Sequence, residues 1–157
     1  MVELRNIYTQ IKDGDWIESK DQSAEGIRLI QTGNIGIGTY LDKDNRAKFI
    51  SEETFNELKC TEVFEGDILI SRLPSPVGRA CLVPKLDGRA ITAVDCTILR
   101  VDRDICIPKY FVYYTMSDMY LNQIDRFVVG TTRARISRKN LEGIKIFLPE
   151  ISKQKKI

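Results

Sequence analysis

Residues 65–83 read EGDILISRLPSPVGRACLV, and this stretch decides the fold. The apolar run 68–70 is too short for a helix that would pack by itself and indicates a buried strand. Pro74 and Pro76 stop both helices and sheet ladders, so the chain must turn at the rim of a sheet. Residues 77–83 are apolar again and predict a second strand that returns from this turn.

Two arginines, Arg72 and Arg79, flank the predicted turn. The sequence leaves two interpretations open for them. They are either the solvated charges of an ordinary hairpin, or guanidinium groups that a rigid loop presents to phosphates or to the edges of guanine bases.

The chain of 157 residues is long enough for one domain with a sizeable core. Hydrophobic residues make up 43% and charged residues 29%, as is typical of globular proteins. No apolar run approaches the ~20 residues that span a membrane, and the first residues lack the apolar segment of a signal peptide, so a cytoplasmic location is expected. The four cysteines form no Cys-x-x-Cys pair, and the chain has no histidine. We therefore predict no metal site, no cofactor and no histidine-dependent catalysis.

Charge is distributed unevenly along the chain. The net charge is only +2, but the segment from Arg126 to Ile157 holds nine Lys/Arg and two Asp/Glu, a net of +7. Residues 1–125 hold the other 15 Lys/Arg and 20 Asp/Glu, a net of −5. This polarity favours a basic surface for an anionic partner, although folding could also mix the two parts on one surface.

In the first half of the chain, apolar residues at helical spacing predict a short helix over residues 4–11, and Trp16 is predicted to be a core anchor. Residues 27–30 predict a strand, and a helix capped by Ser51 is expected to run to about residue 59 with two apolar side chains, Phe55 and Leu58, toward the core.

In the second half, residues 90–101 predict one long β-rich stretch. The strongest helix is expected from Pro108 to about Ile124. A last strand is expected over residues 144–148. From Pro149 the chain reads as the start of another helix, too short to be stable alone, so we expect either a longer helix or one that docks on another surface.

Two loops carry polar side chains suited to nucleic acid. The glycine-rich segment after residue 30 contains Gln31, Thr32 and Asn34, whose side chains could bond base edges or could simply satisfy the backbone of a turn. The segment 126–139 has five basic residues and no acidic one. Its candidate contacts are Thr131, Thr132, Arg133 and Arg135, followed by Arg138 and Lys139 as phosphate anchors.

Four motifs, in this order and at this spacing, resemble the target recognition domain of type I restriction–modification specificity subunits. They are IQTGNI at 30–35, EGDILIS at 65–71 with VGR at 77–79, GTTRARISRKNL at 130–141, and IKIFLP at 144–149 followed by QKKI at 154–157.

The resemblance implies a single α+β domain with a twisted, β-rich mixed sheet and a few packed helices. Residues 1–149 would form the DNA recognition domain, and residues 150–157 would begin a spacer helix. The family reads double-stranded DNA and docks methyltransferase and restriction subunits, which carry the chemistry. Full subunits carry two such domains, so this chain is expected to be either a half-subunit that pairs with itself or another half, or a fragment with one domain.

Two rival functions belong to other classes. A Mg²⁺-dependent nuclease would use a Glu-x-Lys pair at Glu18 or Glu57, with Asp42 or Asp44 as a further metal ligand for the second. A protein-interaction domain would use the basic end of the chain to dock an acidic partner.

Overall fold

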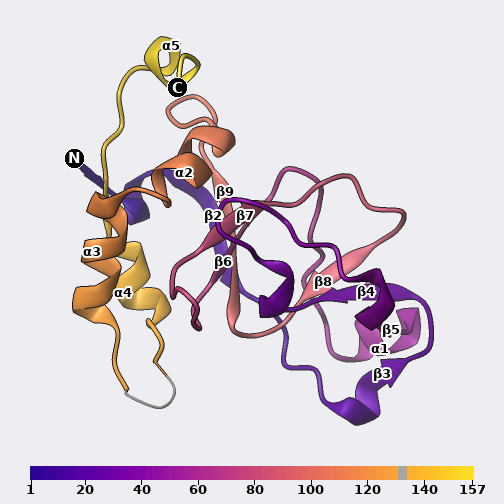
Figure 1. Ribbon diagram of the computed structural model, residues 1–157. Helices are drawn as coiled ribbons and strands as arrows, with labels where there is room; N and C mark the ends of the chain where they lie inside the picture. Colours follow the sequence, from indigo (N-terminus) through magenta and orange to yellow (C-terminus); the bar gives the residue numbers. More distant parts are fainter. Residues whose placement is uncertain (131–133) are drawn as a thin grey trace.

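Two four-stranded sheets lie at the centre of the computed structural model, which describes residues 1–130 and 134–157 (Figure 1). The strands are β1 (Val2–Glu3), β2 (Tyr8–Asp13), β3 (Gln22–Ser23), β4 (Ile27–Ile30), β5 (Lys48–Ile50), β6 (Ile68–Ser71), β7 (Ala80–Leu82), β8 (Ala90–Thr92), β9 (Cys96–Val101) and β10 (Lys145–Ile146). The helices are α1 (Glu52–Glu57), α2 (Pro108–Tyr114), α3 (Asp118–Phe127), α4 (Arg138–Glu142) and α5 (Ile151–Gln154). Short 3-10 turns are η1 (Leu4–Asn6), η2 (Ser19–Asp21), η3 (Thr32–Asn34) and η4 (Asp44–Arg46).

The predicted hairpin is confirmed, and its first strand is buried on both faces. β6 pairs antiparallel with β7 on one side and with β9 on the other, in a sheet of order β2-β9-β6-β7. Ile68 and Ile70 pack into the same core cluster as Phe111 of α2 and Tyr120 of α3. Leu69, between them, points into a separate cluster toward the second sheet. Because successive side chains of a strand point to opposite faces, only a continuous apolar run can satisfy this position.

The molecule is therefore layered, with helices on one side of the first sheet and the second sheet on the other (Figure 1). The second sheet has the order β3-β5-β4-β8, and its β4–β8 pair is parallel while its other pairs are antiparallel. Its far face packs Ile27, Leu29 and Ile91 against Phe55 of α1. This confirms an α+β fold with a mixed sheet, although the strands divide between two main sheets and a small β1–β10 ladder.

Three local predictions for the first 60 residues are wrong. Residues 4–11 form η1 and most of β2 and not a helix. Trp16 is 70% exposed, because it lies on the connection between the two sheets, just after β2 ends. The helix capped by Ser51 is confirmed, since the Ser51 hydroxyl accepts a hydrogen bond from the Thr54 N–H at 3.0 Å, but Leu58 lies beyond its end and is 43% exposed.

Two long elements predicted for the second half are each split. The stretch 90–101 divides into β8 and β9, which belong to different sheets. The helix predicted from Pro108 ends at Tyr114, and a new helix starts where the Ser117 hydroxyl accepts a hydrogen bond from the Tyr120 N–H at 3.2 Å. This second start lets Tyr120 point inward, where its hydroxyl donates to the Gly78 carbonyl at 2.8 Å. The burial raises the pKa of Tyr120.

The last helix docks on its own domain. Gln154 of α5 is buried, and its amide accepts a hydrogen bond from the Ile107 N–H at 2.8 Å and donates to the Ile105 and Pro149 carbonyls. This side chain ties α5 to the start of α2 and stabilises a helix that is too short to persist alone. None of the helices in the described ranges is long and apolar enough to cross a bilayer.

The layered arrangement predicts that two leucines differ strongly in how much they contribute to the free energy of unfolding. Replacing Leu69, which is fully buried between layers, by Ala should lower the free energy of unfolding by about 2–5 kcal/mol because a cavity remains in the core. The same change at the exposed Leu58 should cost less than about 1 kcal/mol. Urea denaturation of both variants measures the difference, and similar losses would contradict the layer assignment.

Candidate nucleic-acid interface

Three loops from distant parts of the sequence meet at one end of the first sheet. They are the loop 31–38 after β4, the turn 72–79 between β6 and β7, and residues 134–137 before α4. Two buried arginines, Arg72 and Arg79, join these loops through hydrogen bonds to main-chain carbonyls.

Arg79 fastens the loop 31–38 to the β6–β7 turn. Its side chain donates to the carbonyls of Ile35 at 2.6 Å and Thr32 at 2.9 Å. It also donates to the carbonyls of Leu73 at 2.8 Å and Pro76 at 3.2 Å, which lie in its own turn. Burial lowers the pKa of Arg79, but several carbonyl acceptors compensate the buried guanidinium.

Arg72 joins the turn to the segment before α4. Its side chain donates to the carbonyls of Val94 at 3.0 Å and Ile136 at 3.4 Å. Its main-chain carbonyl accepts a hydrogen bond from the Ile136 N–H at 3.2 Å. Two carboxylates balance its charge, with Asp13 at 3.5 Å from its Nε and Asp95 at 3.9 Å from its Nη2.

Both arginines are candidate DNA contacts by sequence, but the structure turns both guanidinium groups into the protein. Arg72 is 5% exposed and Arg79 is 8% exposed, and both use their N–H groups inside the fold. We therefore assign them a role in positioning the loops and omit them from the contacts proposed below.

Asn34 also has an internal role. It is buried, its side-chain oxygen accepts a hydrogen bond from the Gln31 N–H, and its side-chain nitrogen donates to the Leu41 carbonyl, both at 2.9 Å. Gln31 and Thr32 are half-buried next to the exposed Gly33, so they are the polar side chains that this loop can offer.

Two further arginines are exposed and attached to the same cluster. Arg135 is 47% exposed, and its Nη2 donates to Asp95 at 3.2 Å. Arg138 is 43% exposed and lies 3.8 Å from Asp13 and 3.6 Å from Glu142. Asp13 and Asp95 are therefore each shared between the buried Arg72 and one exposed arginine.

Lys139 is a further exposed basic candidate. It lies in the first turn of α4, a helix that begins where the Ser137 hydroxyl accepts a hydrogen bond from the Asn140 N–H at 3.1 Å. Thr131, Thr132 and Arg133 lie outside the described residues.

Two carboxylates of the rival nuclease site are engaged elsewhere, since Asp44 and Asp42 both pair with Arg28, at 3.0 and 3.6 Å. Glu18 pairs with Lys20, the lysine of its own Glu-x-Lys motif, at 3.5 Å. Across residues 1–130 and 134–157, no three His, Cys, Asp or Glu side chains gather in a way that could hold a metal ion. Cys81 and Cys96 are buried, and burial raises the pKa of their thiols to about 12 and about 11.

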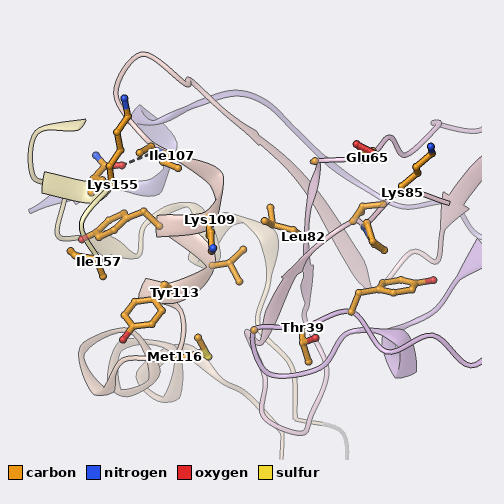
Figure 2. Close-up of a pocket in the computed structure, with 18 residues that line it drawn as sticks. Thr39, Glu65, Leu82, Lys85, Ile107, Lys109, Tyr113, Met116, Lys155 and Ile157 are labelled. Atoms are coloured by element: carbon orange, nitrogen blue, oxygen red, sulfur yellow. Dashed lines mark hydrogen bonds between the residues drawn. The ribbon is translucent and has the colours of Figure 1, made fainter. Parts of the chain in front are cut away.

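A large groove that the sequence analysis missed lies at the other end of the hairpin (Figure 2). Its volume is about 1150 Å³, and it runs between the end of β7, helix α2 and the C-terminal residues. Leu82, Tyr113, Met116 and Ile157 line it with apolar surface, and Lys109 stands among them. The sequence feature that could have indicated this groove is the broad apolar face over 108–124. This face has more apolar side chains than are buried in the core.

Because Arg79 bonds carbonyls of two loops, its replacement should lower the free energy of unfolding. A lysine, which has the same charge, should not restore it. Arg79→Ala should lower the free energy of unfolding by about 3 kcal/mol, because it leaves buried carbonyls such as those of Thr32 and Ile35 without a donor. Arg79→Lys should not restore it, because an ammonium group cannot reach several divergent carbonyls. Arg103→Ala, at an exposed position, is the control.

Denaturant unfolding measures the loss, and amide hydrogen exchange should accelerate over residues 32–38 in both Arg79 variants. Unchanged exchange in this loop would refute the role of Arg79 as its clamp.

Comparison with known proteins agrees with this architecture. The family model for the type I restriction modification DNA specificity domain matches residues 2–157. The specificity subunit of the type I restriction enzyme MjaVIII from Methanocaldococcus jannaschii is 23% identical over 161 residues, covering 99% of this chain and 36% of that protein.

Two solved structures share the fold. The S subunit of a type I restriction-modification system from M. genitalium has a TM-score of 0.64 at 16% identity, over 98% of this chain and 35% of that one. The HsdS subunit from Thermoanaerobacter tengcongensis has a TM-score of 0.70 at 19% identity, over 99% of this chain and 34% of that one. The chain thus spans about a third of the length of these relatives. Since the family model covers nearly every residue, this chain belongs to the family of type I restriction modification DNA specificity domains.

Proposed function

We propose that this chain binds double-stranded DNA and recognises one half of a bipartite target for a type I restriction–modification system. Membership of the family carries the proposal. The exposed basic residues Arg135, Arg138 and Lys139 support it. Their segment is joined through Arg72 to the β6–β7 turn, and Arg79 fastens the loop of Gln31 and Thr32 to the same turn. In this proposal the chain supplies specificity, and methyltransferase and restriction subunits in the cytoplasm supply the catalysis.

The contacts divide by chemistry. Arg135, Gln31 and Thr32 read base edges, since a guanidinium suits guanine and an amide suits adenine in the major groove. Arg138 and Lys139 bind phosphates and supply affinity that falls with added salt. Thr131, Thr132 and Arg133 remain candidates from the sequence for the same surface.

The domain boundaries are part of the proposal. Residues 1–149 form the recognition domain, and residues 150–157 begin the spacer helix. The hydrogen bonds of Gln154 support a fixed exit direction for that helix, because they hold α5 against α2. Pairing with a second recognition half, from another copy or another chain, would complete the bipartite site.

Selection from a random pool of duplexes, first with the chain alone and then with the methyltransferase subunits present, tests the function. We expect one short motif to be enriched. Arg135→Ala should weaken binding to that motif by about 1–3 kcal/mol and relax the choice at one base pair. An enriched motif that is unchanged in Arg135→Ala would remove Arg135 from base reading, and no enriched motif under either condition would refute the proposed function.

Phosphate contacts predict a different result. Lys139→Ala should weaken binding to all sequences equally and reduce the slope of log affinity against log salt by about 1. Lys153→Ala is the matched control, because Lys153 is an exposed lysine on α5, which lies apart from α4 (Figure 1). Fluorescence anisotropy over a salt series measures both slopes, and equal slopes for the two variants would remove Lys139 from the contact surface.

A further inference from the structure

The ion pairs around Arg72 form a chain of alternating charge that ends at the protein surface. Asp95 lies between the buried Arg72 and the exposed Arg135, and Asp13 lies between Arg72 and the exposed Arg138. Glu142 extends the chain beyond Arg138, and its carboxylate accepts a hydrogen bond from the Tyr8 hydroxyl at 2.6 Å. Two acidic residues are thus placed directly behind the arginines that the proposed function brings to DNA.

The sheet holds both acidic residues, Asp13 through its side chain and Asp95 through its main chain. Asp13 is the last residue of β2, and Thr97 of β9 pairs with it in register and donates from its hydroxyl to the Asp13 carboxylate at 3.0 Å. Asp95 is in the turn between β8 and β9, and its main-chain carbonyl accepts a hydrogen bond from the Arg72 N–H at 2.9 Å. The Asp13 carboxylate therefore keeps a partner in the sheet when Arg138 moves, and Asp95 keeps its main-chain position and the cationic Arg72 as a neighbour when Arg135 moves.

A carboxylate held behind an arginine has two effects on binding. It orients the guanidinium, so that the arginine loses less conformational freedom when it binds. The remaining N–H groups of the guanidinium stay available to donate to a base edge. The carboxylate also offsets part of the positive charge that draws the arginine to any phosphate. The first effect strengthens the specific complex and the second weakens the non-specific one, so both increase discrimination.

We propose that Asp95 is a specificity-determining positioning residue that acts on DNA recognition through Arg135. The proposal rests on the proposed function and goes beyond it, because it assigns discrimination to an acidic side chain that need not touch DNA. Asp13 has the corresponding place behind Arg138.

The test compares affinities for the selected duplex and for a scrambled duplex of the same length. Asp95→Asn keeps the shape and removes the charge, so binding to the scrambled duplex should strengthen while the ratio of the two affinities falls about tenfold. Asp104→Asn, which removes one charge at an exposed position elsewhere, should change both affinities equally. Asp95→Glu should restore most of the ratio.

A double-mutant cycle separates positioning from a general effect on the fold. In the Arg135→Ala background, adding Asp95→Asn should not change the ratio of the affinities for the selected and scrambled duplexes any further. An unchanged ratio in the single Asp95→Asn variant, or an equal further fall in the Arg135→Ala background, overturns the proposal. If Asp95→Asn does not fold, Asp95→Ser takes its place in the same cycle.

The two proposals fail in different ways. A wild-type chain that selects no motif, alone or with the methyltransferase subunits, refutes the proposed function. A wild-type chain that selects a motif, with an Asp95→Asn variant that discriminates as well as the Asp104→Asn control, refutes only the role of Asp95.

Discussion

Two buried guanidinium groups constrain the end of the first sheet. Burying a charge costs several kcal/mol unless it is paired and hydrogen-bonded. Arg79 meets that cost with carbonyls from two loops, and Arg72 meets it with two carbonyls and two carboxylates. Because the acceptors come from separate segments, neither guanidinium has its partners unless those loops are assembled together. The loop arrangement is therefore a condition of stability, and in the proposed function the same loops form the recognition surface.

The sequence predicted correctly those elements whose pattern of apolar residues is compatible with only one secondary structure. The run 68–70 is buried on both faces, and only a strand between two layers fits it. The pattern of Leu4, Ile7 and Ile11 admitted a second solution, in which η1 and β2 deliver the same side chains to the same core. The helical region 108–124 was predicted at the right place, but its division into the two helices α2 and α3 was not predicted. Its apolar face reads as continuous across residue 117, although Ser117 followed by Asp118 is itself a start signal.

The candidate site was predictable as a set of loops but not as a set of contacts. Whether an arginine faces solvent depends on the carbonyls near it, and two of the four that Arg79 bonds come from 44 and 47 residues away in the sequence. The same applies to Asn34, whose partner Leu41 lies across a loop. Residue type indicated nucleic-acid chemistry for all of them. Only the fold separates the arginines that hold the loops from those that reach the surface.

The charge polarity of the sequence acquires a more precise meaning in the fold. The acidic first part and the basic last part meet at the ion pairs of Asp95 with Arg135 and of Asp13 with Arg138. The surplus of +7 in the last segment is thus partly neutralised before any ligand arrives. An uncompensated basic surface would bind every duplex strongly, since phosphates are the same along all DNA. If the chain selects among sequences as proposed, it gains from neutralising part of its positive charge internally. The ion pairs do this at Arg135, proposed to read bases, and at Arg138, proposed to bind phosphate.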